Sequence, residues 1–413
     1  MAASTKYPSI DDGEFSGLPV LLRVDINSPI DHSSGKIVND NRIVKSIPTI
    51  RDLLSQGARL TIMAHQGDTT DYRSLISLKE HAQRLTALLG QTVHFIEDVA
   101  GPAAVNAINA LKDGEVLLLD NIRYLTEEAS TFEDSVEQTP AEMGQCYLVR
   151  RLAPLFKAYV NDAFAAAHRN SPSMVGFQPL IPSYAGRLLL DELNALAAIT
   201  DDPETPCIYL LGGARAGDAF GMIEQVLKDG SADKLLLSGL IGQIFMLADG
   251  INIGASSAGF ISVKGFDSYI GDAQQYLQSH RDKIIYPTDV AVSIDNKRHT
   301  LAPHEVADEL DICDIGERTI AEYQNTIANA KTILVNGPCG VYEDALFENG
   351  TREIWNAVAN AEGFSVIGGG DSVTSFKKYT DINKLNYVST AGGALIRYLS
   401  GVRLPLLESF RTY

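Results

Sequence analysis

Residues 19–26, PVLLRVDI, form a short apolar run that ends in charged and polar residues, and this pattern recurs along the chain. In the first half it returns as RLTIMAHQ (59–66), VHFIED (93–98), EVLLLDN (115–121) and AYVNDAF (158–164). In the second half it returns as CIYLLGGA (207–214), KLLLSG (234–239), KIIYPTDVAVS (283–293), KTILVNGP (331–338), FSVIGGGD (364–371) and YVST (387–390). Leucine-rich or β-branched runs that alternate with helical patterns are typical of βαβ units. The sequence therefore predicts an α/β fold with mainly parallel sheets.

Helical patterns lie between these runs. The segment SLKEHAQRLTALLG predicts a helix that begins at Ser77, with Glu80 three residues on, and ends at Gly90. Two further helices are predicted by apolar residues at helical spacing. Their apolar faces consist of Ile43, Ile47, Ile50 and Leu54 in one helix and of Ile320, Tyr323, Ile327 and Ala330 in the other.

With 413 residues the chain exceeds what one hydrophobic core supports, so we expect two Rossmann-like domains. Between them, PSYAGRLLLDELNALAAIT predicts one helix of roughly 14 residues, and the polar TDDPETP follows it. We therefore predict an N-terminal domain at 1–184, a hinge helix and linker at 185–206, and a C-terminal domain at 207–399. The last segment, 400–413, is apolar enough to pack back onto the N-terminal domain. We expect each domain to carry one ligand-binding site, and both sites to face a central cleft between the domains.

The composition excludes several classes of protein. The formal charge of −18, from 34 basic and 52 acidic residues, is unlike that of a nucleic-acid or anionic-membrane binder. The first residues lack the pattern of a secretory signal, and no apolar stretch approaches the length of a bilayer span. The four cysteines have no CxxC spacing, which argues against a zinc site or a disulfide framework. A soluble cytoplasmic protein is expected.

In the first half, the predicted strands run into polar and basic residues. In parallel sheets, ligands bind beyond the carboxyl ends of the strands, so these residues should converge. They are Arg23, Asp25, Asn27, His65, Asn121, Arg123, His168 and Arg169, together with Arg42 at the start of a helix. Each alone is also compatible with a surface, salt-bridge or structural role. Together they favour binding of a small phospho-carboxylate, because guanidinium groups bind carboxylate and phosphate oxygens in bidentate fashion.

In the second half, the predicted strands end in glycine. The four loops are LLGGARAGD (210–218), VNGPCGVYE (335–343), VIGGGDS (366–372) and STAGGA (389–394). Glycines let backbone N–H groups and helix N-termini approach phosphate oxygens, although a single pair also suits a tight turn. Asp371 is the candidate Mg²⁺ ligand, with a helix cap as the alternative. An anionic acceptor in one domain and a nucleotide in the other indicate a kinase.

The ordered motifs of the chain resemble those of phosphoglycerate kinase over nearly its whole length. They are RVDINSP (23–29), DNRI (40–43), AHQG (64–67), LLLDNIRY (117–124), YVNDAFAAAHR (159–169), LLGGARAGD, NGPCGVYE (336–343), IGGGDS (367–372) and STAGGA. The wording of RVDINSP, AHQG and FAAAHRNSPSMVGF (164–177) is similar to the archaeal branch of the family.

This resemblance implies a role for each matching residue. The residues implied to hold the phosphoglycerate are Asp25, Asn27, Arg42, His65, Gln66, Gly67, Arg123 and Arg169, with Arg23 and His168 in support. Those implied to hold the nucleotide are Gly213, Ala214, Arg215, Asn336, Glu343, Gly369, Gly370, Asp371 and Ser372, with Asp371 also on Mg²⁺. Those implied to act in the transfer step are Arg42, Arg215 and Gly370.

The resemblance further implies direct, reversible transfer between 1,3-bisphosphoglycerate and MgADP, giving 3-phosphoglycerate and MgATP, in glycolysis and gluconeogenesis. It also implies hinge bending around the helix near residues 186–200, and a monomer.

The chain departs from the family pattern where positive charge is expected. Asp68 and Thr69 follow AHQG in place of a basic residue and Pro, Arg215 replaces a Lys, and Ala219 and Ala391 are altered. A carboxylate at residue 68 would repel a phosphorylated acceptor unless the loop turns it away and brings in Arg73, which is otherwise a solvated loop residue. Three hypotheses stay open: an active phosphoglycerate kinase, a phosphotransferase for a different, less charged acceptor, and a nucleotide-binding paralogue with little turnover.

Overall fold

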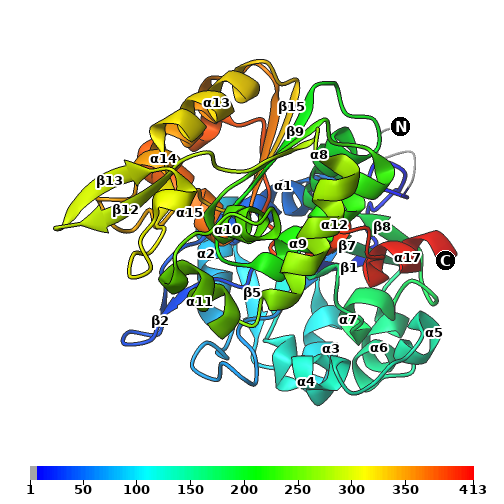
Figure 1. Cartoon of the computed structure of the whole chain (residues 1–413). Helices are drawn as coiled ribbons and strands as arrows, with labels where there is room; N and C mark the ends of the chain where they lie inside the picture. Colours follow the sequence, from blue (N-terminus) through cyan, green and yellow to red (C-terminus); the bar gives the residue numbers. More distant parts are fainter. Residues whose placement is uncertain (1–6) are drawn as a thin grey trace. The chain divides into compact units, whose positions relative to one another are not determined.

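The computed structural model describes residues 7–413 (Figure 1). The first six residues, part of the predicted N-terminal domain, lie outside the described residues. The chain divides into two compact units, one with the residues up to Asn194 plus Arg403–Tyr413, the other with Ala195–Val402. The division at Asn194 falls within helix α8 (Arg187–Thr200), which has the 14 residues predicted for it.

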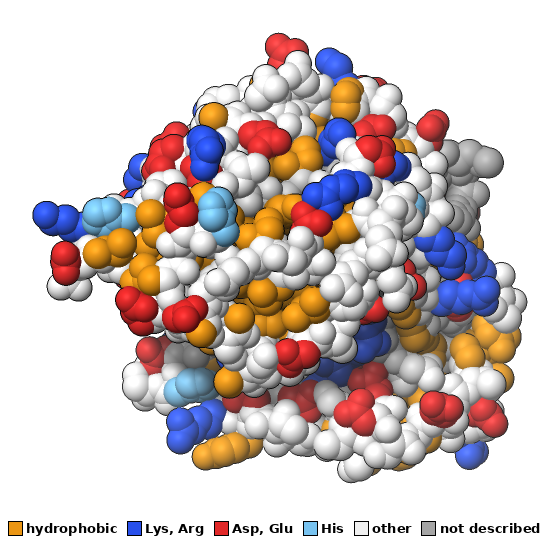
Figure 2. Space-filling view, in the orientation of Figure 1, with side chains coloured by type: hydrophobic (Ala, Val, Ile, Leu, Met, Phe, Trp, Pro, Cys, Tyr) orange, Lys and Arg blue, Asp and Glu red, His pale blue; other side chains and the backbone are white. Residues whose placement is uncertain are grey.

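Charged side chains are common on the surface (Figure 2), as the acidic composition predicts. Acidic side chains are spread over the face drawn in Figure 2, with Lys and Arg side chains between them. Among residues 7–413, no helix is both long enough and apolar enough to cross a membrane.

The first unit is built on a six-stranded parallel sheet. In spatial order its strands are β5 (Val93–Ile96), β6 (Val116–Leu119), β4 (Arg59–Met63), β1 (Pro19–Val24), β7 (Ala158–Asp162) and β8 (Ser183–Ala185). Each neighbouring pair is parallel, which confirms the predicted sheet type. A separate two-stranded hairpin comprises β2 (Ile30–Asp31) and β3 (Lys36–Ile37).

Helices cover both faces of this sheet, because successive side chains of a buried strand point to opposite sides. Val20, Leu22 and Val24 of β1 share a core with α1 (Asn41–Ser55) and α2 (Lys79–Leu89). Leu21 of the same strand shares a second core with α3 (Pro102–Ala110) and α6 (Tyr147–Leu152). The shorter helices of this unit are α4 (Ser130–Glu133), α5 (Pro140–Met143) and α7 (Pro172–Val175).

Helix α2 corrects the predicted start at Ser77. It begins at Lys79, and the Ser77 hydroxyl accepts only the Lys79 N–H, at 3.3 Å, so it does not reach further into the first turn. The predicted end is confirmed: Gly90 caps the helix with a left-handed φ of 74°.

The second unit repeats the plan with another six-stranded parallel sheet. Its strands, in spatial order, are β11 (Ile284–Ile285), β10 (Lys234–Leu237), β9 (Cys207–Leu211), β15 (Thr332–Asn336), β16 (Phe364–Gly368) and β17 (Tyr387–Val388). One face shares a core with α13 (Glu317–Ala328), α14 (Asn349–Asn360) and α15 (Gly370–Tyr379). The remaining helices are α9 (Ala216–Asp229), α10 (Gly239–Ala248), α11 (Ala255–Val263), α12 (Asp267–His280) and α16 (Gly393–Leu399).

The single strand predicted at 283–293 is wrong. The run is broken around Pro287, which cannot donate a ladder hydrogen bond, into β11 of the large sheet and β12 (Val290–Ile294) of a different sheet. Strand β12 pairs antiparallel with β13 (Lys297–Leu301) and β14 (Asp314–Ile315).

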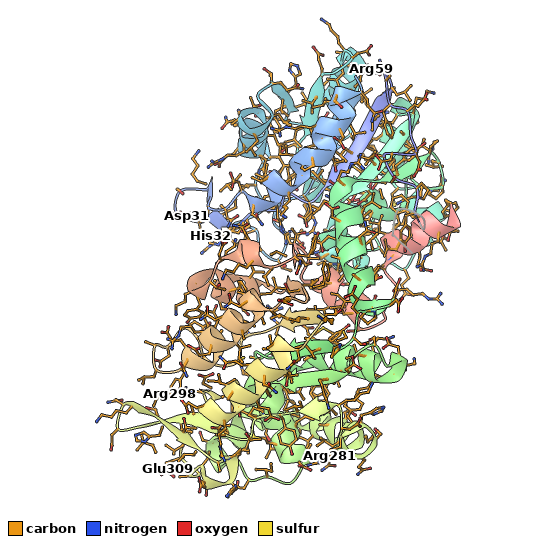
Figure 3. The ribbon with its side chains drawn as sticks, turned by 90° about the horizontal axis from the view of Figure 1, so that it is seen from above. Asp31, His32, Arg59, Arg281, Arg298 and Glu309 are labelled. Carbon is orange, nitrogen blue, oxygen red and sulfur yellow. The ribbon has the colours of Figure 1, made fainter. Side chains whose placement is uncertain are left out.

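A tight turn joins β12 to β13. Its residues Asp295 and Asn296 have φ of 51° and 57°, a backbone region that Asp and Asn tolerate better than most residues. Arg298 of β13, labelled in Figure 3, donates to the Asp314 carboxylate at 2.9 Å and to the Ile315 carbonyl at 2.8 Å. An ion pair between the half-buried Arg298 and the buried Asp314 thus stabilises the small sheet.

The last helix, α17 (Pro405–Thr412), packs on the first unit. Leu406 is fully buried, and its N–H donates to the Ala167 carbonyl at 3.2 Å. Ala167 directly precedes His168 and Arg169, two residues that were predicted to bind the acceptor substrate or to support its binding. The helix therefore supports the loop that carries them.

Replacing Leu406 with Ala should lower the free energy of unfolding by about 2–4 kcal/mol, because it leaves a cavity under α17. Urea denaturation followed by circular dichroism measures the change. Leu180→Ala, the same substitution at a side chain that is 48% exposed, is the matched control and should cost under about 0.5 kcal/mol. Equal effects would contradict the structural role of Leu406.

Candidate functional site

The carboxyl ends of the strands in the first unit carry the predicted acceptor residues. Arg23 is near the end of β1 and Asp25 and Asn27 follow it, while His65, Gln66 and Gly67 follow β4. Arg123 lies in a 3-10 turn (Ile122–Tyr124) after β6, and His168 and Arg169 follow β7. Arg42 lies in the first turn of α1.

A cavity of about 400 Å³ opens at this edge of the sheet. Its lining residues are Asn27, Ser28, Pro29, Arg42, Gln66, Gly67, Asp68, Asp71, Ser74, Arg123 and Arg169. Six predicted acceptor residues thus come together here: Asn27, Arg42, Gln66, Gly67, Arg123 and Arg169. The other four, Arg23, Asp25, His65 and His168, do not line the cavity.

Arg23 lies in the interior, with only 2% of its surface exposed. Its guanidinium donates to the Val24 carbonyl and to Ser173 Oγ, the latter at 3.2 Å. Ser173 in turn donates its backbone N–H and its hydroxyl to the two carboxylate oxygens of Glu128, at 2.6 and 2.7 Å. Burial raises the pKa of Glu128 to about 7, although the Arg23 charge opposes the shift. A buried carboxyl and a buried guanidinium are therefore linked through one serine.

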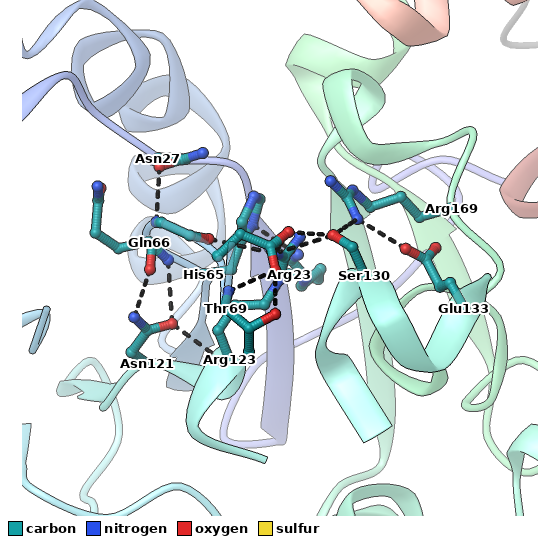
Figure 4. A network of polar contacts seen from close by, with 12 residues as sticks. Arg23, Asn27, His65, Gln66, Thr69, Asn121, Arg123, Ser130, Glu133 and Arg169 are labelled. Carbon is teal, nitrogen blue, oxygen red and sulfur yellow. Dashed lines mark hydrogen bonds and ion pairs between the residues drawn. The ribbon is translucent and has the colours of Figure 1, made fainter. Parts of the chain in front are cut away.

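His65 bonds to the same guanidinium, as Figure 4 shows, with 3.0 Å between Arg23 Nη2 and His65 Nδ1. Since arginine only donates, Nδ1 must accept, which makes the imidazole neutral with its proton on Nε2. Burial lowers the pKa of His65 in agreement, with Asp25 opposing the shift. His65 can therefore offer an uncharged N–H donor.

Two loops are locked together by Gln66 and Asn121. The Asn121 amide accepts from Gln66 N–H at 3.1 Å and donates to the Gln66 carbonyl at 2.6 Å. The Gln66 side chain is fully buried and accepts from Ser28 N–H at 2.8 Å. Gly67 has a φ of 68°, and a Cβ there would collide with the Ser74 backbone. Gln66 thus fixes the loop through its side chain, whereas Gly67 lets the backbone line the cavity.

Each arginine of the cavity is paired with a carboxylate of the chain. Asp25 accepts from Arg42 at 2.8 Å. Burial opposes ionisation of Asp25, but the charge of Arg42, together with the other positive charges nearby and the Asn27 N–H, outweighs burial and lowers the Asp25 pKa to about 2. The other two pairs are Arg169 with Glu133, at 2.7 Å, and Arg123 with Asp68.

Asp68 faces the cavity, whereas Arg73 is exposed and does not line it. The idea that the loop turns Asp68 away and brings Arg73 in is therefore wrong. The physical reason is that Asp68 has its own cation in Arg123 and a hydroxyl donor in Ser130.

The second unit has a cavity of about 410 Å³ at the carboxyl ends of β9 and β15. Four predicted nucleotide residues line it: Gly213, Ala214, Glu343 and Asp371. Apolar side chains such as Leu240, Phe260 and Val290 form much of the remaining wall. The other predicted residues, Arg215, Asn336, Gly369, Gly370 and Ser372, are outside the lining.

Asn336 and Ser372 hold the glycine loops together. Asn336 Nδ2 donates to the Gly368 carbonyl at 3.3 Å, and Ser372 Oγ accepts from Gly337 N–H at 2.7 Å. Gly337 has a φ of 94°, and a Cβ there would collide with the Gly212 carbonyl. The loops after β9, β15 and β16 therefore approach so closely that side chains are excluded.

Helix α15 begins at this edge, with Gly370 exposed and Asp371 exposed in its first turn. A Cβ on Gly370 would meet nothing within 4 Å, so there is open space at the start of this helix, where N–H groups can bind an anion. Within residues 7–413 no cluster of three or more acidic, His or Cys side chains could hold a metal by itself. The single carboxylate of Asp371 instead fits Mg²⁺ that is bound partly by nucleotide phosphates and water.

The other departures lie at α9 and at the loop before α16. Arg215 is the exposed N-cap residue of α9, without a side-chain capping bond. Ala219, one turn later, is 3% exposed, and Ala391 is 2% exposed. The positions of Ala219 and Ala391 are thus suited to small side chains.

Four residues around the site arginines were not predicted from the sequence. Ser130, Glu133 and Ser173 contact an arginine directly, and Glu128 is linked to Arg23 through Ser173. The available signal was electrostatic: several buried guanidinium groups need counter-charges nearby. The acidic segment LTEEASTFED (125–134), which follows Arg123, was the place to look.

Comparisons with known proteins match nearly the full length of the chain to one family. The family model described as phosphoglycerate kinase matches residues 10–402. A phosphoglycerate kinase of Methanothermobacter thermautotrophicus is 40% identical over 405 residues, covering 98% of this chain and 97% of that protein. One of Thermococcus kodakarensis is 38% identical, covering 97% and 96%.

Solved structures show the same likeness. The crystal structure of phosphoglycerate kinase from Pyrococcus horikoshii superimposes with a TM-score of 0.86 at 36% identity, covering 98% of both chains. The structure of phosphoglycerate kinase from Coxiella burnetii gives 0.83 at 30% identity, covering 98% of this chain and 99% of that chain.

The raised pKa of Glu128 predicts a pH-dependent stability. The folded protein binds this proton more tightly than the unfolded chain, whose value is near 4.5, so the stabilisation is complete below that pH. It is lost as the pH rises through about 7. Glu128→Gln stays neutral, and should lose about 3 kcal/mol less than the wild type between pH 4.5 and 8.

Urea denaturation across this pH range measures the effect. The exposed Glu137→Gln is the control, which should follow the wild-type profile. Parallel profiles for Glu128→Gln and the wild type would refute the buried, proton-binding role of Glu128.

Proposed function

The chain belongs to the phosphoglycerate kinase family, whose members transfer a phosphoryl group to a carboxylate acceptor, and we propose that it does so between 1,3-bisphosphoglycerate and MgADP. The reverse reaction consumes 3-phosphoglycerate and MgATP. The family implies a place in glycolysis, and gluconeogenesis uses the reverse direction. The supporting observation is that the two units have different cavities. The first unit has an arginine-lined cavity, and the second has a cavity bordered by glycine loops.

In the first unit, Arg42, Arg123 and Arg169 would bind the phosphate and carboxylate of the acceptor, because they line the cavity. Asn27 and the Gly67 backbone would complete the wall. The four predicted residues outside the cavity lining would support the residues that line it; they are Arg23, Asp25, His65 and His168. Asp25 does so by orienting Arg42. Gln66 would fix the conformation of the loop after β4.

In the second unit, Gly213 and Ala214 would lie along the adenine, and Glu343 would take the ribose. The backbone N–H groups of Gly369 and Gly370, at the start of α15, would meet the phosphates. Asn336 and Ser372 would act by fixing these loops. Asp371 would bind Mg²⁺, which supplies positive charge to the nucleotide phosphates when bound.

The chemistry would be direct transfer without a covalent enzyme intermediate. The 3-phosphoglycerate carboxylate oxygen attacks the γ-phosphorus of ATP, an O–P bond forms, and the β–γ bridging P–O bond breaks to release ADP. Arg42, Arg215 and the Gly370 N–H would stabilise the charge on the transferred group. The two ligands must meet away from water, so a hinge movement about α8 is part of the proposal. We also propose a cytoplasmic monomer.

One observation favours a second candidate, a phosphotransferase for a less charged acceptor. Asp68 lines the acceptor cavity and adds a negative charge to it. The third hypothesis is a paralogue with little turnover. It is disfavoured because one cavity retains its three arginines and the other retains Glu343 and Asp371.

The direct test couples the purified protein, ATP, MgCl₂ and 3-phosphoglycerate to glyceraldehyde-3-phosphate dehydrogenase and follows NADH oxidation. Turnover that depends on 3-phosphoglycerate is expected at roughly 1 to 1000 per second, the usual range for enzymes. Absence of turnover, together with absence of calorimetric 3-phosphoglycerate binding, would refute the proposed function.

Arg215→Ala should lower kcat by about 100-fold and change the KM for ATP less than about threefold, if Arg215 acts on the transferred group. Lys228→Ala removes an exposed charge at the other end of α9 and serves as the control with unchanged kinetics. A larger effect on KM than on kcat would instead make Arg215 a nucleotide-binding residue.

A further inference from the structure

In the arginine-lined cavity of the first unit, carboxylates of the chain itself balance the positive charges. Its three lining arginines, Arg42, Arg123 and Arg169, are each paired with a carboxylate of the chain. An acceptor bearing both a phosphate and a carboxylate must therefore enter a site whose cations are already engaged.

The three carboxylates differ in where they lie. Asp25 and Glu133 approach their arginines from outside the cavity lining, whereas Asp68 itself lines the cavity. Asp25 is also held by the Asn27 N–H at 3.0 Å. Asp68 thus stands where an anionic group of the acceptor would approach Arg123.

Ser130 joins two of the pairs, and Figure 4 shows its contact with Arg169. Its hydroxyl donates to the Asp68 carboxylate and accepts from Arg169 at 3.1 Å and, more weakly, from Arg123 at 3.5 Å. Arg123 is 3% exposed and Asp68 17% exposed at their side chains, so water screens this pair little.

Asp68 is ionised at any pH near neutrality. Its burial works against ionisation, but the Ser130 hydroxyl and the Arg123 charge outweigh it and lower the Asp68 pKa below its ordinary value. Protonation therefore does not remove the charge under working conditions. Only movement of the side chain away from Arg123 can do so, and its neighbours Thr69 to Arg73 are exposed residues of one loop.

We propose that Asp68 is a specificity-determining internal anion, which occupies the Arg123 anion-binding position and is displaced when the phosphate or carboxylate of the acceptor binds. This inference rests on the proposed function for the identity of the acceptor. Displacement of Asp68 weakens the binding of every anion that uses Arg123. The loss of binding free energy grows with the negative charge of the ligand, because the displaced carboxylate stays nearby and repels it.

The test compares Asp68→Asn with Asp71→Asn. Both remove one negative charge from the same cavity, but Asp71 makes no ion pair within residues 7–413. Isothermal titration of the nucleotide-free full chain measures binding of 3-phosphoglycerate and of inorganic phosphate. Asp68→Asn should tighten both about tenfold, and Asp71→Asn less than about threefold. An unchanged or weaker affinity in Asp68→Asn, or equal gains in the two variants, would overturn the proposal.

Ser130→Ala provides a second variant that keeps all charges. It removes the hydroxyl that holds Asp68, so binding of inorganic phosphate should tighten about threefold; weaker or unchanged binding would count against the proposal. The result is separable from that of the proposed function. Wild-type turnover with unaltered phosphate affinity in Asp68→Asn refutes only the internal anion. Tighter phosphate binding in a protein without turnover refutes only the kinase function.

Discussion

Burial of the Arg23 guanidinium is the constraint around which the first unit is arranged. A fully desolvated cation is tolerable only where hydrogen bonds and a counter-charge surround it. The chain meets this demand with the Val24 carbonyl, Ser173, His65 and, one step further, Glu128. These groups come from β1, α7, the loop after β4 and the segment after β6. The hydrogen bonds and counter-charge of Arg23 thus bring four separate segments to the edge of the sheet where the arginine-lined cavity opens.

The predicted elements were most accurate where local pattern and burial coincide. Strands such as β6 and β9 are continuous apolar runs, and α8 has an apolar pattern bounded by polar residues. The three-stranded sheet was missed because β13 is a polar strand, KRHTL, with no apolar face to predict it. Its strongest signal was the Asp295–Asn296 pair, which suits a tight turn. The predicted start of α2 is wrong because Ser77 lies one residue ahead of the N-cap position, which Leu78 occupies without a side-chain bond.

For the site, the sequence predicted the cations but not their partners. Arginines at strand ends converge because the topology of a parallel sheet brings those ends together. Which carboxylate reaches which arginine depends on loop conformation: Glu128 meets Ser173 only after the chain has passed through β7. The same limit explains Gln66. Its position beside a predicted binding residue was clear from the motif, but the burial of its side chain among Ser28, His81 and Asn121 depends on tertiary structure.

Helix α17 gives the first unit a discontinuous sequence, since residues 403–413 return to it after the whole second unit. A ribosome therefore completes the second unit before it releases the residue whose N–H meets the Ala167 carbonyl. The loop bearing His168 and Arg169 lacks that support in any shorter nascent chain. The support of this loop is consequently tied to translation of the segment at 403–413. A chain truncated before that segment would contain the whole second unit, but its first unit would lack the contact with Leu406.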